Sequence, residues 1–358
     1  GHRLSSVDED KYQYFVMSAT ARKELKRATN ELHALFMHAT DYVLQNPAVL
    51  EKFNLPSVIW PRLHQSWDNR RNQMVTGRFD FCMTEQGLKV YEYNADSASC
   101  QMECGKIQGL WARRFGCEDG EDAGEDLFDQ LVTAWEQTEV DGLVHILLDN
   151  DQEEMYHALF MKSAMEQAGI ECKLVKALAG VQWQGADTIL DADGVPIHWI
   201  WKTWAWETAL DQLRQELDED VQRQLLRQPP EHKPPRLMDV LLRPSTMVFE
   251  PIWTLIPSNK AILPVLWEMF PDHPYLLEAH FQLTDGLRAR GYVSKPIAGR
   301  CGYNISVVDK EQAVLTETSG QFDEQQQIFQ ELRALPQVGS HRAQLSTFSA
   351  GGVYAGAC

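Results

Sequence analysis

The stretch RFDFCMTEQGLKVYEYN, residues 78–94, decides the fold of the region around it. It reads as two β-strands joined by a tight turn, because aromatic and β-branched residues alternate with polar ones on both sides of Gly87. Gly87 can adopt the positive φ angle that closes a three-residue loop, 85–87. That loop pairs Thr84 with Leu88 and predicts that Asp80 lies opposite Glu92.

The alternation also predicts a polar face for this hairpin. Side chains alternate along a strand, so Arg78 and Asp80 share a face, and Glu92 and Asn94 share the corresponding face of the second strand. The aromatic residues are expected on the opposite face: Phe79, Phe81, Tyr91 and Tyr93. Facing carboxylates repel each other, and either Arg78 or a divalent cation could offset the repulsion. Carboxylate and amide oxygens suit magnesium. A solvated sheet face is the alternative, and a one-residue shift in register would separate the carboxylates.

The same stretch, continued through ADSAS at residues 95–99, resembles the motif of the glutathionylspermidine synthetases, which are related to trypanothione synthetase. PSNK at 257–260 and KPIAGRCG at 295–302 extend the resemblance over nearly the whole chain. It implies a mixed α/β, ATP-grasp-like synthetase fold of the circularly permuted type with N-terminal helices. It also implies an ATP-dependent C–N ligase that joins the glycine carboxylate of glutathione to an amine of spermidine through an acyl phosphate.

The resemblance further implies ATP and magnesium as cofactors and a role for each site residue. Arg78 would face the transferred phosphoryl group as the catalytic residue. The magnesium ligands would be Asp80, Glu92 and Asn94. Besides Arg78, the nucleotide contacts would be Lys260, Lys295, Cys301, Gly302, Gln344 and, along the adenine, Gln330, Glu331, Leu332 and Arg333. Glutathione would contact Ser97, Ser99, Glu154 and Thr208. The polyamine would contact Asp151 and Glu153.

The residues alone leave plainer interpretations open. Lys295 ends a predicted strand, 291–295, before a glycine-bearing turn whose backbone could approach phosphate, but ordinary hairpins look the same. Asp151 and Glu153 lie where a predicted strand, 144–148, meets a predicted helix, and capping of that helix explains them as well as a polyamine does. The P-loop pattern GxxxxGK(S/T) does not occur in the sequence.

The remaining pattern predicts the organisation of the chain. The aromatic region 199–206 reads mostly as strand. Residues 228–236 are rich in proline and charge and form the best linker candidate. We therefore expect a substrate- and magnesium-binding region at 1–236 and a nucleotide-binding region at 237–358. Helices are predicted over 8–53, 103–115, 125–139 and 153–168.

Composition restricts the partners. The 358 residues carry a formal net charge of −18, which disfavours nucleic acid and would attract a cationic substrate, although solubility alone explains such a charge. No stretch approaches the roughly 20 apolar residues of a membrane span, so no membrane partner is expected. Seven scattered cysteines suit a reducing compartment. These features predict a soluble, cytoplasmic protein and leave the oligomeric state open, including a homodimer.

Two departures from the family pattern and three rival functions remain. Bifunctional relatives carry an amidase module before the synthetase region. This sequence begins at the synthetase-like region, so we expect no amidase activity from this chain. Relatives continue beyond the position of Cys358 with an arginine and an acidic residue, which suggests a truncated module. The rivals are a related ligase for another peptide or amine, a non-catalytic ATP- or polyamine-binding module, and a carboxylate kinase that stops at the acyl phosphate.

Overall fold

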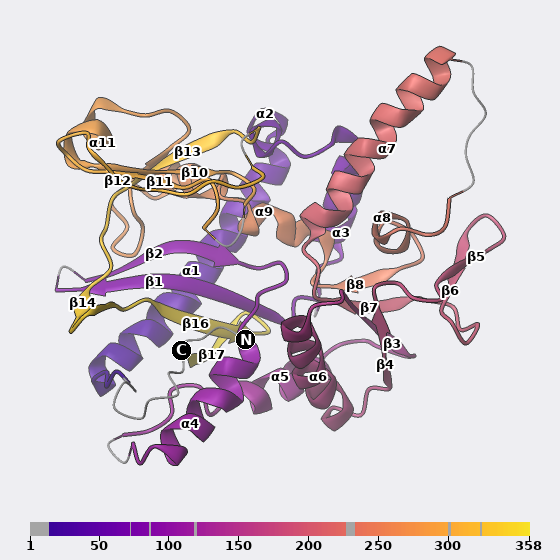
Figure 1. Ribbon diagram of the computed structural model, residues 1–358, viewed down its shortest axis with the longest axis horizontal. Coiled ribbons are helices and arrows are strands. Elements are labelled where there is room, and N and C mark those ends of the chain that lie inside the picture. Colours follow the sequence, from indigo (N-terminus) through magenta and orange to yellow (C-terminus); the bar gives the residue numbers. More distant parts are fainter. Residues whose placement is uncertain are drawn as a thin grey trace.

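The computed structural model describes residues 14–71, 73–85, 87–117, 120–226, 233–299, 302–322 and 324–358, which Figure 1 shows as a ribbon. This part of the chain is a mixed α/β structure, with helices packed on sheets of four, five and four strands. Two further sheets have two strands each. The mixed α/β class expected from the sequence is therefore confirmed. In the described ranges, no helix is long and apolar enough to cross a membrane.

The first four-stranded sheet contains the predicted hairpin. Its strands, in the order β17-β16-β1-β2, are Val353–Ala357, Leu345–Ala350, Thr76–Thr84 and Gly87–Asn94. The register confirms that Asp80 pairs with Glu92 and Arg78 with Asn94. The predicted loop is wrong, because Thr84 pairs with Gly87 rather than with Leu88. The loop is one residue shorter than predicted, but a bulge between Asp80 and Phe81 leaves Tyr91 as an extra residue on β2. Asp80 therefore still pairs with Glu92.

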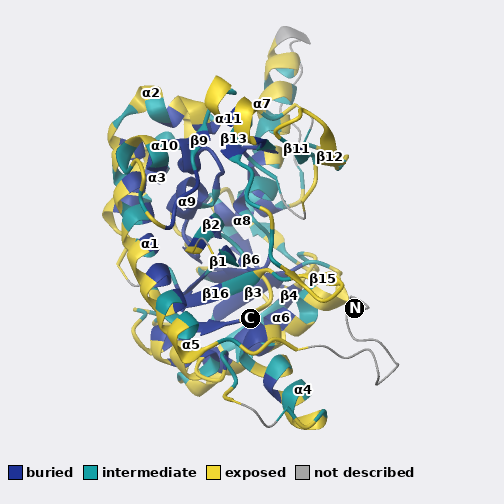
Figure 2. Cartoon of the chain, turned by 90° about the vertical axis from the view of Figure 1, so that its left-hand side faces the viewer, coloured by how far each residue is buried: buried dark blue, intermediate teal, exposed yellow. Residues whose placement is uncertain are grey.

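An aromatic core behind the hairpin holds its polar face outward. Helix α1 (Ala19–Gln45) lies against this sheet, and Figure 2 shows its inward side in the colour of buried residues. Phe36 of α1 packs edge-on against Phe79 and Tyr93, with ring centroids 5.6 and 5.2 Å apart. Phe79 and Tyr93 stack on each other at 3.8 Å. Burial of each ring contributes on the order of 2–3 kcal/mol, so a register slip that exposed them would be costly. Residues 14–18 precede α1 and are not helical, which shortens the helical region expected from residue 8.

A parallel sheet forms the second layer, with order β4-β3-β7-β8. Its strands are β3 (Val144–Leu148), β4 (Cys172–Lys176), β7 (Trp199–Lys202) and β8 (Met247–Phe249). Helix α6 (Gln152–Gln167) connects β3 to β4, as the sequence predicts for a βαβ unit. The expectation of mostly strand over 199–206 is only half right, because β7 ends at Lys202 and α7 (Trp206–Leu226) begins four residues later. In Figure 1, α7 projects from the body.

The third large sheet carries the predicted nucleotide-binding lysine. Its order is β12-β11-β10-β13-β9. The strands are β9 (Ala279–His280), β10 (Tyr292–Pro296), β11 (Ser306–Val308), β12 (Val314–Glu317) and β13 (Gln327–Glu331). In the view of Figure 1 this sheet lies above the hairpin sheet. Strand β10 pairs with β13, with Val293 opposite Gln330.

Shorter elements connect these layers. The other strands are β5 (Gln182–Gln184), β6 (Thr188–Leu190), β14 (Gln337–Val338) and β15 (His341–Arg342). The other α-helices are α2 (Pro47–Leu50), α3 (Trp60–Asp68), α4 (Gln108–Arg114), α5 (Leu127–Glu136), α8 (Leu237–Leu241), α9 (Leu255–Ser258), α10 (Ile262–Met269) and α11 (Asp285–Arg290). A π-helical turn, Glu103–Ile107, precedes α4, and single 3₁₀ turns are Glu51–Phe53, Ser57–Ile59 and Ile252–Thr254.

The proposed division at residue 236 stays an expectation. Of the linker candidate, residues 228–232 lie outside the described residues, and 233–236 form neither helix nor strand. Near the end of the chain, β16 pairs with β1 from its first third, and β17 pairs with β16. The chain therefore returns to the hairpin sheet after building the β10 sheet.

Candidate functional site

The carboxylate of Asp80 lies at the centre of the polar hairpin face. Arg78 donates from Nε and Nη2 to Oδ1 and Oδ2 of Asp80, at 2.9 and 3.0 Å. Ser346 Oγ donates to Oδ1 at 2.8 Å, and Asn94 Nδ2 donates to Oδ2 at 3.2 Å. Burial alone would lower the pKa of Arg78, but the charge of Asp80 raises it above its usual value. Arg78 therefore remains a fixed cation beside this carboxylate.

Glu92, opposite Asp80, is held by lysines. Lys260 Nζ lies 3.2 Å from Glu92 Oε2 and donates to Gly299 O at 3.0 Å. Burial would raise the pKa of Glu92, but the positive charges of Lys260 and Lys295, aided by Arg78, lower it to about 2. Glu92 is therefore ionised at neutral pH.

Lys295 on β10 is buried, with 6% of its surface exposed. Its Nζ donates to Gln330 Oε1 at 2.7 Å and lies 5.5 Å from the ring centroid of Tyr91. Burial lowers the pKa of Lys295 to about 8, although the charge of Glu92 acts in the opposite direction. The structure thus brings Lys260, Lys295 and Gln330 to the hairpin, as the sequence resemblance implies.

Strict alternation predicted that Tyr91 lies behind the sheet with Tyr93. The structure shows that this prediction is wrong. The bulge adds Tyr91 to β2, so its ring faces Lys295 while Tyr93 stays in the aromatic core. Its hydroxyl donates to Arg333 O at 2.6 Å. Alternation in the sequence could not reveal this residue, because a bulge changes the face without changing the pattern.

The donor set fits a magnesium ion that keeps part of its water shell. Asp80 and Glu92 offer carboxylate oxygens, and Asn94 gives its amide nitrogen to Asp80, which leaves its carbonyl oxygen as an acceptor. Within the described ranges, no group of three or more His, Cys, Asp or Glu residues is arranged to hold a metal. Two carboxylates and substrate phosphates are a common way of binding magnesium, so the shortage of protein ligands is compatible with it.

The loop after β2 connects Arg78 to the parallel sheet. Arg78 Nη1 donates to Ser99 Oγ at 3.0 Å and to Ser99 O at 3.2 Å. Ser97 Oγ donates to Trp204 O at 2.6 Å and accepts from Lys202 Nζ at 3.2 Å. Ser97 therefore fixes the loop to the end of β7, and Ser99 positions the guanidinium.

A buried ion pair supports this loop and has no counterpart in the sequence predictions. Lys202 Nζ lies 2.5 Å from Asp96 Oδ1, and their side chains are 0% and 4% exposed. Asp96 Oδ2 accepts from the main-chain N–H of Trp206 at 2.7 Å. Lys202 closes an apolar strand and Asp96 lies far away in the sequence, so no local signal links them.

The predicted acceptor residues lie at helix starts. Asp151 is the N-cap of α6, where its Oδ1 accepts from Glu153 N at 2.7 Å, so the capping interpretation of Asp151 is confirmed. Asp151 and Glu153 are exposed, and Glu154 is half-buried. Thr208, also half-buried, lies in the first turn of α7.

The other predicted nucleotide residues follow β10 and β13. Glu331 pairs with Arg333 at 2.8 Å, and Leu332 N donates to Gly291 O at 3.2 Å. Gly302 is exposed in a turn with φ of 70°, and Gln344 is exposed before β16. Cys301 lies outside the described residues.

Comparison with known proteins places the chain in a family. The sequence model described as glutathionylspermidine synthase preATP-grasp matches residues 3–358. The chain belongs to this family. The chain is 47% identical, over 352 residues, to a bifunctional glutathionylspermidine synthetase/amidase of Escherichia coli (strain K12). That alignment covers 98% of the chain and 57% of the relative.

Two proteins from Crithidia fasciculata are also similar to this chain. Its trypanothione synthetase is 38% identical over 333 residues, covering 91% of the chain and 50% of that protein. Its glutathionylspermidine synthase is 33% identical over 311 residues, covering 80% and 42%. The chain thus spans about half the length of these relatives. The family resemblance inferred from the hairpin motif is confirmed.

Proposed function

We propose that the chain is the synthetase part of an ATP-dependent C–N ligase. The bond formed would be an amide between the glycine carboxylate of glutathione and an amine of spermidine. The observation that carries this proposal is the cluster in which Arg78, Lys260 and Lys295 surround the carboxylates of Asp80 and Glu92. Three cations beside two acids suit a triphosphate and its metal, because the cations meet phosphate oxygens and the acids meet the metal.

Asp80, Glu92 and Asn94 would hold magnesium, and the ion would neutralise charge on the nucleotide phosphates. Arg78 and Lys260 now neutralise these carboxylates. The same cations are the proposed phosphate contacts. Nucleotide and metal would therefore bind together, so that the cations move from the carboxylates to the phosphates and the carboxylates bind the metal. The remaining proposed nucleotide contacts are Gln330, Glu331, Leu332, Arg333, Cys301, Gly302 and Gln344.

The reaction would proceed in two displacements. A carboxylate oxygen of the peptide attacks the γ-phosphorus of ATP, the bond to the bridging oxygen breaks, and ADP leaves. Arg78, oriented by Ser99, would stabilise the charge spread over the transferring phosphoryl group. The amine then attacks the acyl carbon, phosphate leaves with the bonding electron pair, and the amine loses one proton to form the amide.

The substrates are proposed from charge and position. Ser97, Ser99, Glu154 and Thr208 would contact the peptide. Asp151 and Glu153 are exposed acids that could each neutralise an ammonium group of a polyamine. The net charge of −18 agrees with a cationic acceptor. A cytoplasmic location, where ATP is plentiful, and a homodimer remain further proposals.

The test uses the full protein that contains this chain, incubated with ATP, magnesium, glutathione and spermidine. We expect phosphate release that requires both substrates and a conjugate of the two in the mass spectrum. If product forms only when another peptide or another amine replaces glutathione or spermidine, the protein is a related ligase. ADP formation without amine would indicate a carboxylate kinase, and ATP binding without turnover would indicate a binding module. Each of these three results would contradict the proposal.

A further inference from the structure

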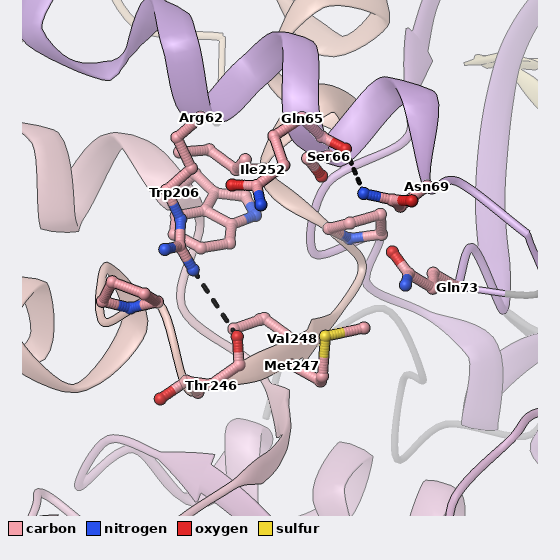
Figure 3. Close-up of a pocket in the computed structure, with 12 residues that line it drawn as sticks. Arg62, Gln65, Ser66, Asn69, Gln73, Trp206, Thr246, Met247, Val248 and Ile252 are labelled. Atoms are coloured by element: carbon pink, nitrogen blue, oxygen red, sulfur yellow. Dashed lines mark hydrogen bonds between the residues drawn. The ribbon is translucent and has the colours of Figure 1, made fainter. Parts of the chain in front are cut away.

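A pocket lies apart from the ligase cluster, between α3 and the edge strand β8 (Figure 3). Twelve residues line it, and none of them belongs to the proposed nucleotide, metal or substrate contacts. Its volume is about 110 Å³. On this measure a single water molecule needs about 10–15 Å³, so the pocket has room for several heavy atoms. That is enough for a carboxylate and the groups next to it.

The charge of this pocket is opposite to that of the protein as a whole. Arg62 is the one charged residue among the twelve, in a chain with 51 acidic and 33 basic residues. Burial lowers the pKa of Arg62, and no carboxylate of the described residues counteracts this effect. By contrast, the neighbouring charge of Asp80 raises the pKa of Arg78. Arg62 is therefore a half-buried cation whose charge no described acid balances.

The guanidinium N–H groups of Arg62 make only long hydrogen bonds to other described residues. Its Nη2 donates to Leu241 O at 3.4 Å and to Thr246 O at 3.5 Å, both near the upper limit for a hydrogen bond. A guanidinium has five N–H donors in a planar fork. Among the described residues, most of this capacity is consequently available to a ligand in the pocket.

Neutral polar groups complete the lining. Figure 3 shows the side-chain amides of Gln65, Asn69 and Gln73 on one side of the pocket, with the indole of Trp206 beside Arg62. In the part of the chain that the structure describes, β8 is the last strand of its sheet, so Val248 borders the pocket from an edge whose main-chain N–H and C=O groups have no neighbouring strand there. Such an edge can hydrogen-bond the amide of a peptide-like ligand.

We propose that this pocket binds a small molecule or peptide end carrying one carboxylate, with the carboxylate on Arg62 and an adjoining amide along β8 and the carboxamides. The planar guanidinium fork matches the two oxygens of a carboxylate. One cation balances the single charge of a carboxylate. The double charge of phosphate would be only half balanced, so the carboxylate is the favoured ligand. This proposal is independent of the ligase function.

The experiment measures binding of N-acetylglycine, which has one carboxylate and one amide, by ligand-observed NMR titration. Inorganic phosphate serves as the second probe. Arg62→Gln removes the cation, and Gln65→Glu places an acid three residues from Arg62 on α3, where it competes with the ligand for the guanidinium. Arg114→Gln removes the same charge from an exposed position on α4 and serves as the matched control. Arg78→Gln tests whether the probe binds at the ligase site instead.

We expect saturable binding of N-acetylglycine that persists in Arg114→Gln and Arg78→Gln and weakens about tenfold or more in Arg62→Gln and Gln65→Glu. Unchanged affinity in both pocket variants would overturn the proposal, as would the absence of saturable binding to the unchanged protein. Loss of binding in Arg78→Gln alone would assign the probe to the ligase site. Tighter binding of phosphate than of N-acetylglycine would overturn the carboxylate assignment.

Discussion

Lys260, which lies between α9 and α10, forms an ion pair with Glu92, with Lys260 Nζ 3.2 Å from Glu92 Oε2. Glu92 lies on β2, whereas the main-chain N–H of Lys260 donates to Ile297 O, just after β10, at 2.8 Å. The Nζ also reaches Gly299 O. Lys260 thus connects the hairpin sheet to the turn beside Lys295, and the ligase cluster lies where these two parts of the chain meet.

Removal of the Glu92 charge should abolish metal-dependent activity. In Glu92→Gln the amide cannot replace an ionised metal ligand, and the charges of Lys260 and Lys295 lose their shared partner. We expect ATP-dependent phosphate release to fall about 100-fold or more. Glu136→Gln, an exposed change on α5, should leave the rate unchanged. Wild-type activity in Glu92→Gln across a magnesium titration would remove the proposed metal role.

Affinity for ATP should fall as the pH rises above 8. The pKa of Lys295 is about 8 in the free protein, so the lysine loses its charge as the pH passes that value. Bound phosphates favour the charged form, and ATP binding near pH 8 should therefore take up protons. Calorimetry in two buffers of different ionisation enthalpy measures this uptake. Lys295→Arg, which stays charged, should bind with a flatter pH profile, whereas the same slope in both proteins would contradict the assignment.

The buried pair of Lys202 and Asp96 should be strongly coupled. Each single change, Lys202→Met or Asp96→Asn, leaves one polar partner without its counterpart in an almost fully buried site. We expect each to lower the free energy of unfolding by about 3–5 kcal/mol. The double variant should lose clearly less than the sum. Urea unfolding of the four proteins completes the cycle, and additive losses would show that the two residues act independently.

Glu250 should make stability depend on pH. It is buried and accepts from Thr76 N at 2.9 Å, and burial raises its pKa to about 7. The folded state then binds more protons than the unfolded state between about pH 4.5 and 7, so stability falls as the pH rises through that range. Glu250→Gln keeps an acceptor for Thr76 and removes the charge. At pH 8 we expect this variant to be more stable by about 2 kcal/mol in urea unfolding.

At pH 5 the difference between Glu250→Gln and the unchanged protein should largely disappear, because the carboxyl group is then mostly neutral in the folded state. A variant that is equally destabilised at both pH values would show that Glu250 acts through its hydrogen bonds rather than through its charge.

The hairpin and the βαβ unit were predictable because their signals are local. Alternation around Gly87 gave the two strands, and the stable pairing of Asp80 with Glu92 follows from the aromatic face that must stay buried. The apolar run 144–148 and the stop at Gly169, whose φ is 81°, gave β3 and α6. Local pattern and final fold agree at these elements, except at the hairpin loop and at Tyr91, where the bulge changes the face.

The rest of the site depends on contacts between distant residues. Lys295 finds Gln330 only because β10 pairs with β13 in one particular register. Lys202 ends an apolar strand, and its partner Asp96 is 106 positions away. The pocket at Arg62 likewise combines α3 with β8. No periodicity within one segment carries such information.

The most direct test of the ligase site is a crystal structure of the protein with ADP and Mn²⁺, which replaces magnesium and gives an anomalous signal. The account predicts an anomalous peak about 2–2.5 Å from oxygens of Asp80, Glu92 and Asn94, with phosphates on Lys260 and Lys295. A peak elsewhere, or bound nucleotide with the contacts of Arg78 to Asp80 and of Lys260 to Glu92 unchanged, would contradict it.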